Sequence, residues 1–226
     1  MSTKRYSKLE NNSSPDTVEN LIPKVKKNCT AKFDESIDLS FQINNKQKKN
    51  EISIRTAVNL PSGSGKTVRV AVICEESKVA MAKEAGADIS GGDEVIDEIK
   101  NGNTNFDKLV CTPSMMIKLS KLGKILGPKG LMPNPKLGTV DEDVVKAVKN
   151  CKSGQVEIRN DKDGNIGVSI GKKSFDDSKL IKNFNAVIEA LEKEKSNSNV
   201  KGNLVKSSFM TSSMGTSFQI KLNKSI

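Results

Sequence analysis

Hydrophobic periodicity changes twice along this chain, at Val68 and at Gly154, and these changes limit the fold more than any single motif does. Residues 68–74 form a nearly continuous apolar run, which is typical of a strand that is buried on both faces. Strand and helix patterns then alternate as far as Ser153, whereas both flanks contain strands in which apolar and polar residues alternate. The sequence therefore predicts a mixed fold, with an α/β middle part between two α+β flanks.

The middle part, residues 68–153, is expected to form a parallel, three-layer α/β domain. Gly86 and Gly102 each follow a helical pattern, at a position where a left-handed residue commonly ends a helix. Alternation of strands and helices at this spacing favours a parallel sheet covered by helices. We predict strands at residues 68–74, 87–90 and 106–111, and helices at residues 77–85, 93–101, 113–119 and 140–150.

The flanks, residues 1–67 and 154–226, are expected to fold together as one discontinuous two-layer α+β domain, with the middle part inserted. Neither flank has enough strands and helices to bury a core alone. We predict a helix at 17–28 interrupted by Pro23, a hairpin turn at 161–164, a helix at 176–194 with Ser174 as N-cap, and a flexible connector at 193–199. Strands are expected at residues 37–43, 51–60, 155–160, 165–171, 203–211 and 217–222.

The positive charge is concentrated in the flanks. The chain has 37 Lys and Arg against 27 Asp and Glu, which gives a net charge of +10. Residues 1–67 carry +5 of this charge, residues 68–153 carry +1 and residues 154–226 carry +4. If the flanks fold together, the molecule has one basic part and one nearly neutral part. A basic surface favours an anionic partner, and we expect that partner to be nucleic acid.

Composition excludes several classes of enzyme. The chain has no histidine, which rules out triads that use imidazole, zinc sites with histidine ligands and acid–base catalysis by histidine. With seven Phe, one Tyr and no Trp, the core must be aliphatic, and stacking of unpaired bases on aromatic rings is not the expected binding mode. The cysteines lie far apart without a Cys-x-x-Cys pair, so we expect buried, reduced thiols at Cys29, Cys74, Cys111 and Cys151.

The sequence carries no signal for a membrane or a cofactor. No apolar run approaches the roughly 20 residues of a membrane-spanning helix, and residues 1–12 are polar, without the apolar core of a signal peptide. We therefore expect a cytoplasmic protein without a membrane partner. We also expect no catalytic residue, no metal site and no cofactor.

Residues 61–67 end in Gly-Lys-Thr, as does the phosphate-binding loop of nucleotide hydrolases. That motif requires a glycine where this chain has Leu60, and it must lead into a helix, whereas a strand is expected here. We therefore interpret this segment as part of a hinge between the two parts of the chain. Its glycines permit backbone rotation, so the hinge residues are Gly63 and Gly65, with Ser153 and Gly154 on the return crossing.

Two further patterns have more than one interpretation. Residues 122–136 place lysines among glycine and proline, which predicts a rigid, exposed, non-helical loop that either contacts RNA backbone or only ends two elements. Residues 32–36, 161–162 and 211–215 hold small polar groups; a hydroxyl beside a glycine lets a backbone approach closely and bind a ribose 2′-hydroxyl. Taken in isolation, each of the segments at residues 32–36, 161–162 and 211–215 is interpreted as an ordinary turn or capping group.

Four motifs occur in the order found in a known family: Lys32-Phe33-Asp34-Glu35, Leu60-Pro61-x-Gly63-x-Gly65-Lys66, Ala85-Gly86-Ala87-Asp88 and the long segment at residues 126–140. On these motifs the chain resembles the bacterial large-subunit ribosomal protein L1 family over essentially its whole length. The resemblance implies an RNA-binding domain made of both chain ends and an inserted Rossmann-like domain.

The resemblance also implies a function that is not enzymatic. Members of the family are structural constituents of the large ribosomal subunit, where they bind a helical junction of ribosomal RNA. They form the mobile stalk near the tRNA exit site and assist the release of deacylated tRNA. They can also repress translation of their own mRNA. A member of this family is expected to be a monomer within the ribosome.

Matched motif by motif, the resemblance implies RNA contacts at Lys32, Phe33 and Ser36, at Asp161 and Lys162, and at Ser213, Met214 and Gly215. Relatives usually read Thr-Met-Gly-Pro where this chain has Ser-Met-Gly and then Thr216. The serine keeps the hydroxyl group and loses the methyl group. Thr56 stands where the family usually has glycine, and residues 46–52 lack the usual Asp-Pro turn, which bears on any contact from Lys48 or Lys49.

The segment at residues 61–67 separates an RNA-binding protein from a nucleotide hydrolase. We expect isothermal titration of the protein with ATP and magnesium to give no binding heat, because the first glycine of the phosphate loop and the helix that should follow it are both missing. Binding at micromolar ATP would instead favour the hydrolase.

Overall fold

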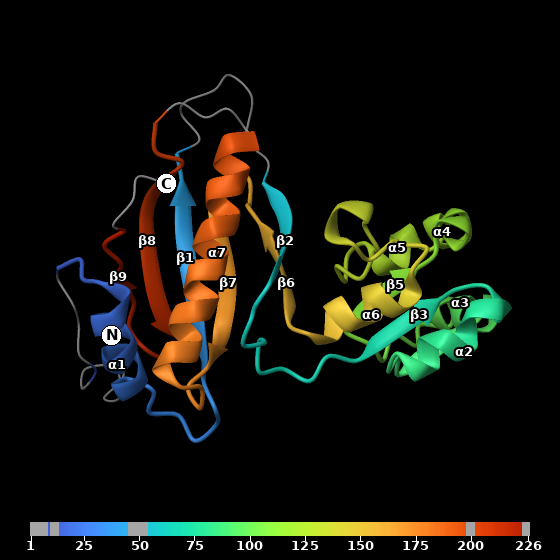
Figure 1. Ribbon diagram of the computed structural model, residues 1–226, viewed down its shortest axis with the longest axis horizontal. Helices are drawn as coiled ribbons and strands as arrows, with labels where there is room; N and C mark the ends of the chain where they lie inside the picture. The colour runs from blue at the N-terminus through green and yellow to red at the C-terminus, as the bar shows by residue number, and fades with distance from the viewer. Residues whose placement is uncertain (1–8, 10–13, 45–53, 198–201, 223–226) are drawn as a thin grey trace. The chain divides into compact units, whose positions relative to one another are not determined.

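The computed structural model describes residues 9, 14–44, 54–197 and 202–222. The fold mixes helices with parallel and antiparallel sheets, which confirms the mixed α/β class (Figure 1). The chain divides into two compact units. Unit 1 comprises Met1–Gly65 and Val156–Ile226, and unit 2 comprises Lys66–Gln155. Residues 1–8, 10–12 and 46–52, about which the sequence made predictions, lie outside the described part of the chain.

The main sheet of unit 1 is antiparallel and combines strands from both flanks. Strand β1 (Ser36–Ile43) lies between β7 (Asn165–Lys172) and β8 (Val205–Ser212), and β9 (Phe218–Gln219) pairs with β8. Leu39 pairs with Val168 on one side and with Met210 on the other. A second, two-stranded sheet joins β2 (Arg55–Asn59) to β6 (Gln155–Arg159). The N-terminal flank thus has its central strand bonded on both sides by the C-terminal flank.

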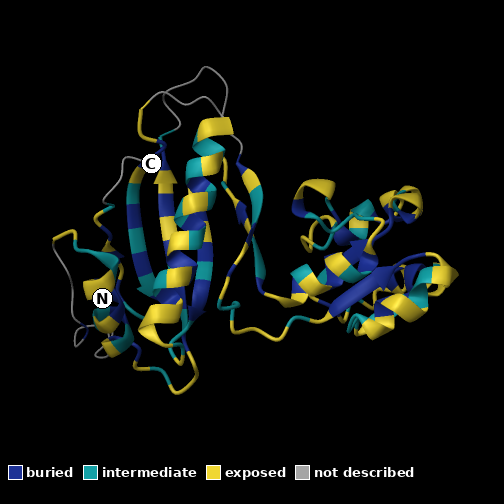
Figure 2. Ribbon diagram, viewed as in Figure 1, coloured by how far each residue is buried: buried dark blue, intermediate teal, exposed yellow. Residues whose placement is uncertain are grey.

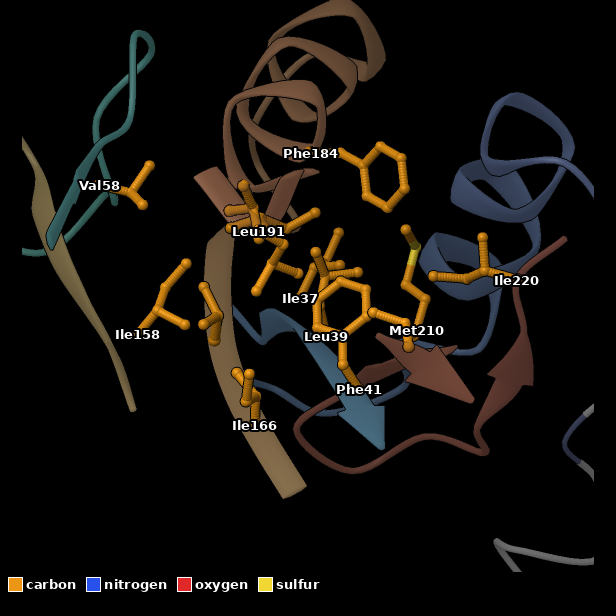
Figure 3. Packing of buried hydrophobic residues seen from close by; sticks show 14 of the residues in the cluster. Ile37, Leu39, Phe41, Val58, Ile158, Ile166, Phe184, Leu191, Met210 and Ile220 are labelled. Atoms are coloured by element: carbon orange, nitrogen blue, oxygen red, sulfur yellow. The ribbon is translucent and has the colours of Figure 1, made fainter. Parts of the chain in front are cut away.

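One face of the main sheet is apolar because residue types alternate along β1. Ile37, Leu39, Phe41 and Ile43 are buried, whereas Ser40 and Gln42 are exposed on the other face (Figure 2). Helices α1 (Val18–Lys27) and α7 (Asp177–Asn197) pack on the apolar face. Figure 3 shows Leu39 and Phe41 close to Met210 of β8 and Phe184 of α7. The core of unit 1 therefore lies between the main sheet and these helices, and it also includes Val58 of β2 and Ile158 of β6.

Unit 2 is built around a three-stranded parallel sheet in the order β4-β3-β5. Its central strand, β3 (Val70–Ile73), is buried at every position, and its outer strands are β4 (Ile89–Gly91) and β5 (Lys108–Cys111). Ala71 and Ile73 face one apolar cluster, and Val70 and Val72 face another. Helices thus cover both faces: α2 (Glu76–Glu84), α3 (Asp93–Lys100), α4 (Pro113–Ser120), α5 (Gly123–Leu126) and α6 (Val144–Lys152).

Two helices of the fold begin or continue differently from the sequence prediction. Helix α1 runs through Pro23 without interruption, since the buried side chains around the proline hold the helix on the sheet. Helix α6 begins at Val144 rather than at Val140, because the side chain of Asp143 accepts a hydrogen bond from the backbone N–H of Lys146 (3.2 Å). Val140 instead forms a parallel bridge with Cys111.

The start and end of α7 also differ from expectation. Ser174 is not its N-cap: the helix begins at Asp177, and Ser174 donates a hydrogen bond through its hydroxyl to Asp34 (2.7 Å). The helix continues to Asn197, so the connector predicted at 193–199 is helical over its first five residues. That segment is rich in Glu and Lys, which are good helix formers, and this outweighs its polar, low-complexity appearance.

The predicted turn at residues 161–164 is present, but the strands on either side separate. β6 pairs with β2, and β7 pairs with β1. Only an isolated antiparallel bridge between Asn160 and Ile166 joins them. The prediction of a simple hairpin was therefore wrong, because each strand gains more ladder hydrogen bonds with a partner that is distant in sequence.

The segment at residues 122–136 is neither wholly exposed nor non-helical. It contains α5 and the 3-10 helix η3 (Pro135–Leu137), and the side chains of Leu122 and Leu126 are buried in unit 2. Its lysines are exposed: Lys124, Lys129 and Lys136. The prediction failed because it ignored the leucines between the glycines and prolines. Burial of their side chains in unit 2 stabilises a helical conformation, whereas an exposed loop would leave this apolar surface in water.

The segment that resembles a phosphate loop leads into strand β3, with no helix after it. Gly63 and Gly65 both have left-handed φ angles, of 74° and 71°. A Cβ atom on Gly65 would lie 2.8 Å from Cγ of Lys172 and 3.1 Å from the ring of Phe175. Gly65 is therefore held closely against unit 1.

A buried asparagine of α7 fixes the same segment. Asn183 is fully buried, and its side-chain oxygen accepts a hydrogen bond from the backbone N–H of Ser62 (3.0 Å). Its amide group donates to the carbonyl oxygens of Gly63 (2.9 Å) and Ile170 (2.7 Å). One side chain thus satisfies three backbone groups and joins the end of the N-terminal flank to β7.

Replacement of this asparagine should be costly. We expect Asn183→Ala to lower the free energy of unfolding by about 2–4 kcal/mol, since three backbone groups lose their partner in the interior. The matched control is Asn185→Ala on the exposed side of the same helix, which should change stability by less than about 0.5 kcal/mol. Urea denaturation followed by circular dichroism measures both, and equal effects would contradict the role given to Asn183.

Candidate nucleic-acid interface

Six of the eight residues predicted to contact RNA lie at one edge of the main sheet of unit 1. Antiparallel pairing brings the start of β1, the end of β7 and the end of β8 together there: Ser36 pairs with Lys172, and Ile37 pairs with Ser212. The segments that adjoin these strand ends carry the predicted residues. We call this set the β1–β8 edge; it comprises Lys32, Phe33, Ser36, Ser213, Met214 and Gly215.

The two predicted serines bind each other. The backbone N–H of Ser36 donates to the hydroxyl oxygen of Ser213 (3.0 Å), and the backbone N–H of Ser213 donates to the carbonyl oxygen of Ser36 (3.0 Å). The hydroxyl of Ser213 thus closes the end of the sheet, a structural role that the sequence could not distinguish from RNA contact. Serine serves here as well as threonine because only the hydroxyl is used.

The β1–β8 edge exposes two large apolar side chains. Phe33 is 56% exposed and Met214 is 52% exposed, and among the described residues only Met81 and Ile117 of unit 2 are also large, apolar and exposed. Covering such side chains with a partner removes apolar surface from water and so favours binding. Lys32, beside Phe33, is also exposed. The edge therefore combines apolar and cationic contact groups.

Gly215 permits a tight turn at this edge. Its backbone N–H donates to the carbonyl oxygen of Ser212 (3.2 Å). A Cβ atom at this position would lie 2.4 Å from the hydroxyl oxygen of Ser212, which is itself buried. A side chain at this position would require the buried hydroxyl of Ser212 to shift, so glycine suits this turn.

Two lysines beside the β1–β8 edge were missed by the sequence analysis. Lys172 ends β7 and donates to the hydroxyl of Ser36 (2.9 Å), and Lys173 donates to the carbonyl oxygen of Cys29 (2.8 Å). Their ammonium groups add positive charge beside the predicted residues. The sequence does show two consecutive lysines directly after a predicted strand. Only the antiparallel register, however, shows that the end of this strand lies beside Ser36.

Thr216, which stands where relatives usually have proline, directly follows the last residue of the β1–β8 edge. Its hydroxyl accepts a hydrogen bond from the side-chain amide of Asn28 (2.9 Å), and both residues are buried. The departure from the family motif therefore introduces a polar side chain that is partnered. It ties the segment after β8 to the end of α1.

Asp161 and Lys162 lie at the other end of the sheet. The backbone N–H of Ile43, the last residue of β1, donates to the carbonyl oxygen of Gly164 in the same turn (2.7 Å). β1 runs from Ser36 to Ile43, so this turn is about 24 Å from the β1–β8 edge. The structure thus separates these two residues from the other six.

The carboxylate of Asp161 is occupied by its own turn. It accepts hydrogen bonds from the backbone N–H of Asn165 (2.6 Å) and from the side-chain amide of the same residue (3.1 Å). These bonds favour the charged form and lower the pKa of the Asp161 carboxyl below its ordinary value. A carboxylate used in this way stabilises the turn, and its negative charge repels phosphate.

A groove between α1, α7 and β9 does not suit RNA. Its volume is about 360 Å³, and it is lined by apolar and neutral polar side chains together with three carboxylates, those of Glu19, Glu189 and Glu192, and one ammonium group, that of Lys221. Three carboxylates would repel a phosphate backbone. This groove is therefore not part of the candidate interface.

The cysteines behave as the sequence predicted. All four are free and buried, and burial raises the pKa of each thiol, that of Cys111 to about 11. Within residues 9, 14–44, 54–197 and 202–222, no group of three metal-ligating side chains is found. Within the same residues, none of the helices has the length and apolar character needed to cross a bilayer.

Comparison with known proteins shows the family. The model of the ribosomal protein L1p/L10e family matches residues 25–216. The chain belongs to this family. It is 65% identical to large ribosomal subunit protein uL1 of Pelagibacter ubique, with all of both chains covered. It is 46% identical to uL1 of Rickettsia akari and 48% identical to uL1 of Rickettsia africae, with 97% and 92% of this chain and 92% and 87% of those relatives covered.

Family membership confirms the resemblance found in the sequence. The chain is a ribosomal protein, and it is not an enzyme. Its location is that of its family, in the cytoplasm and associated with the ribosome. Of the pattern predicted at residues 32–36, 161–162 and 211–215, the structure brings the first and last segments together and leaves residues 161–162 at the other end of the sheet.

The pKa of Asp161 tests whether this residue serves the turn. In Asn165→Ala the side-chain donor is lost and the backbone donor remains, so the pKa of Asp161 should rise towards its ordinary value without reaching it. Carbon-13 NMR titration of the carboxyl groups measures this, with Asp16 (pKa about 2, held low mainly by Lys24) as an internal control.

The sign of the stability effect follows. Because the pKa is lowered in the folded protein, the stabilisation is present above about pH 4 and is lost as the pH falls through the folded-state value. An Asp161 midpoint that does not move in Asn165→Ala would contradict the hydrogen bonds described.

Proposed function

We propose that this ribosomal protein binds large-subunit ribosomal RNA through the β1–β8 edge. The observation that carries the proposal is the convergence of Phe33 and Met214, both exposed, with Lys172 and Lys173 beside them, at one end of the sheet. The relatives are named large ribosomal subunit proteins, which supports the same assembly for this chain.

The chemistry of the edge suits folded RNA. Lysine ammonium groups neutralise phosphates and release counterions, which supplies affinity without reading sequence. The tight turn at Gly215 lets backbone approach closely, so that backbone groups can bind ribose hydroxyls. Phe33 and Met214 would cover apolar faces of sugars and bases. Recognition would then depend on the shape of the RNA rather than on pairing with its bases.

We further propose that the two units act as domains. Unit 1 would be the discontinuous RNA-binding domain, and unit 2 the inserted Rossmann-like domain that carries the tip of a mobile stalk near the tRNA exit site. Because Gly63 and Gly65 are fixed to unit 1, the hinge would use residues 66–69, which have no regular structure, together with Ser153 and Gly154.

The roles proposed in tRNA release and in translation control rest on the family resemblance. The protein would act as a monomer within the ribosome, assist the release of deacylated tRNA and repress translation of its own mRNA by binding a similar RNA structure. Asp161 and Lys162 would contact RNA only where it extends along the whole sheet.

Comparison of Lys162→Ala with Lys32→Ala tests how far the RNA extends. Lys162→Ala should weaken RNA binding only if the RNA reaches the turn that contains Lys162.

Competition separates specific RNA recognition from binding to any polyanion. A ribosomal junction RNA should compete with labelled ribosomal RNA at much lower concentration than tRNA or duplex DNA does. Equal competition by all three would favour a nonspecific, basic chaperone or DNA-binding protein. Footprinting of the ribosomal RNA with and without the protein then locates the site.

A matched pair of methionines tests the proposed edge. Met214→Ala should weaken binding of the junction RNA by about 5- to 30-fold, because burial of one exposed methionine side chain contributes about 1–2 kcal/mol. Met81→Ala, in unit 2, removes a side chain of similar exposure (48% against 52%) and should leave the affinity unchanged. Filter binding measures both, and equal effects would exclude the edge as the contact surface.

A further inference from the structure

Glu35 is a buried carboxylate directly behind the β1–β8 edge. Its relative exposure is 0%, although its neighbours Lys32, Phe33 and Asp34 are all exposed. A carboxylate leaves water only at high cost unless hydrogen bonds or charges compensate it. Its burial at this position therefore needs an explanation in terms of its partners.

Two of those partners are backbone N–H groups. One carboxylate oxygen accepts a hydrogen bond from the backbone N–H of Ala31 (2.8 Å), and the other accepts from the backbone N–H of Met214 (3.1 Å). Hydrogen bonds from a neutral donor to a charged acceptor are stronger than neutral ones. The side chain of Glu35 thus joins two segments that are about 180 residues apart in the sequence.

These two bonds act on the two exposed apolar residues. The bond to Ala31 closes a short loop, and Phe33 lies in the middle of that loop. The bond to Met214 holds the backbone of the other exposed residue directly. Because both bonds end on one carboxylate, they set the distance between the segment of Phe33 and the segment of Met214.

Electrostatics alone would oppose an acid at this position. If phosphates approach the β1–β8 edge, a nearby carboxylate repels them, and its removal should tighten binding. A positioning role has the opposite sign, because loss of the hydrogen bonds would free the two contact residues. The two explanations can therefore be separated by the direction of the effect.

We propose that Glu35 is a positioning residue for RNA recognition, which holds Phe33 and Met214 at the spacing that the RNA surface requires. This inference rests on the proposed function of the β1–β8 edge. Glu35 does not touch the RNA, and acts through the backbone of the residues that do.

The test is Glu35→Gln, which keeps the size of the side chain and removes its charge. An amide presents an oxygen on one side only, so it cannot accept from both N–H groups at once. We expect the affinity for the junction RNA to fall by about 10-fold or more, as loss of a charge-assisted hydrogen bond would produce. The matched control is Asp38→Asn, which removes a carboxylate from the solvent-facing side of β1, three residues away, and should leave the affinity equal or higher.

Two further measurements separate positioning from simple loss of folding. Hydrogen exchange at the Met214 amide, measured without RNA, should be faster in Glu35→Gln while the amides of β1 stay protected. In a Met214→Ala background, Glu35→Gln should cost less affinity than in the natural chain, because the residue it positions is gone. If Glu35→Gln fails to fold, Glu35→Asp, which keeps the charge on a shorter side chain, serves in the same measurements.

The outcomes are distinct. Unchanged or tighter RNA binding by Glu35→Gln, or full additivity with Met214→Ala, would overturn the positioning role. If the natural chain does not bind the junction RNA, the proposed function fails, and the inference about recognition fails with it. The exchange measurement still distinguishes the cases, because it reports the hydrogen bond to Met214 whether or not RNA binds.

Discussion

The fold of unit 1 depends on the hydrogen bonding of β1 to β7 on one side and to β8 on the other. β1 comes from the N-terminal flank and both neighbours come from the C-terminal flank. Neither flank can satisfy these backbone groups by itself, since a strand at a sheet edge leaves a row of donors and acceptors unpaired. The core beneath the sheet and the position of every residue at the β1–β8 edge follow from this one arrangement.

The same pairing explains why the candidate interface is small and well ordered. Antiparallel neighbours bring the start of one strand beside the end of the next, so three short segments meet at the β1–β8 edge without a long loop. Buried polar groups behind the edge, those of Glu35 and the Asn28–Thr216 pair, bind backbone or one another, and the exposed Ser213 binds the backbone of Ser36. The exposed residues in front of them are therefore presented on a rigid support, which favours recognition of RNA by shape.

Much of the fold and of the candidate interface could be predicted from the sequence, and the predictions that failed did so for physical reasons. The alternation of apolar and polar residues predicted β1, because a strand buried on one face needs an apolar residue at every second position. The continuous apolar run predicted β3, because a strand buried on both faces needs apolar residues at every position. Six of the eight proposed contacts gather at one edge, whereas the turn at Asp161 does not join them, since sequence order says nothing about which strand ends meet. Lys172 and the buried role of Glu35 were missed for the same reason: both depend on register.

The most direct test is a map of the amides that RNA protects. Hydrogen exchange of the full-length protein, with and without a ribosomal junction RNA, would report every segment that the RNA covers or orders. We expect new protection at residues 31–36 and 212–216, from both ends of the chain at once, with little change at the turn that contains Asp161. Protection confined to that turn, or to the lysine-rich segment at residues 122–136, would contradict an RNA surface made by the two chain ends.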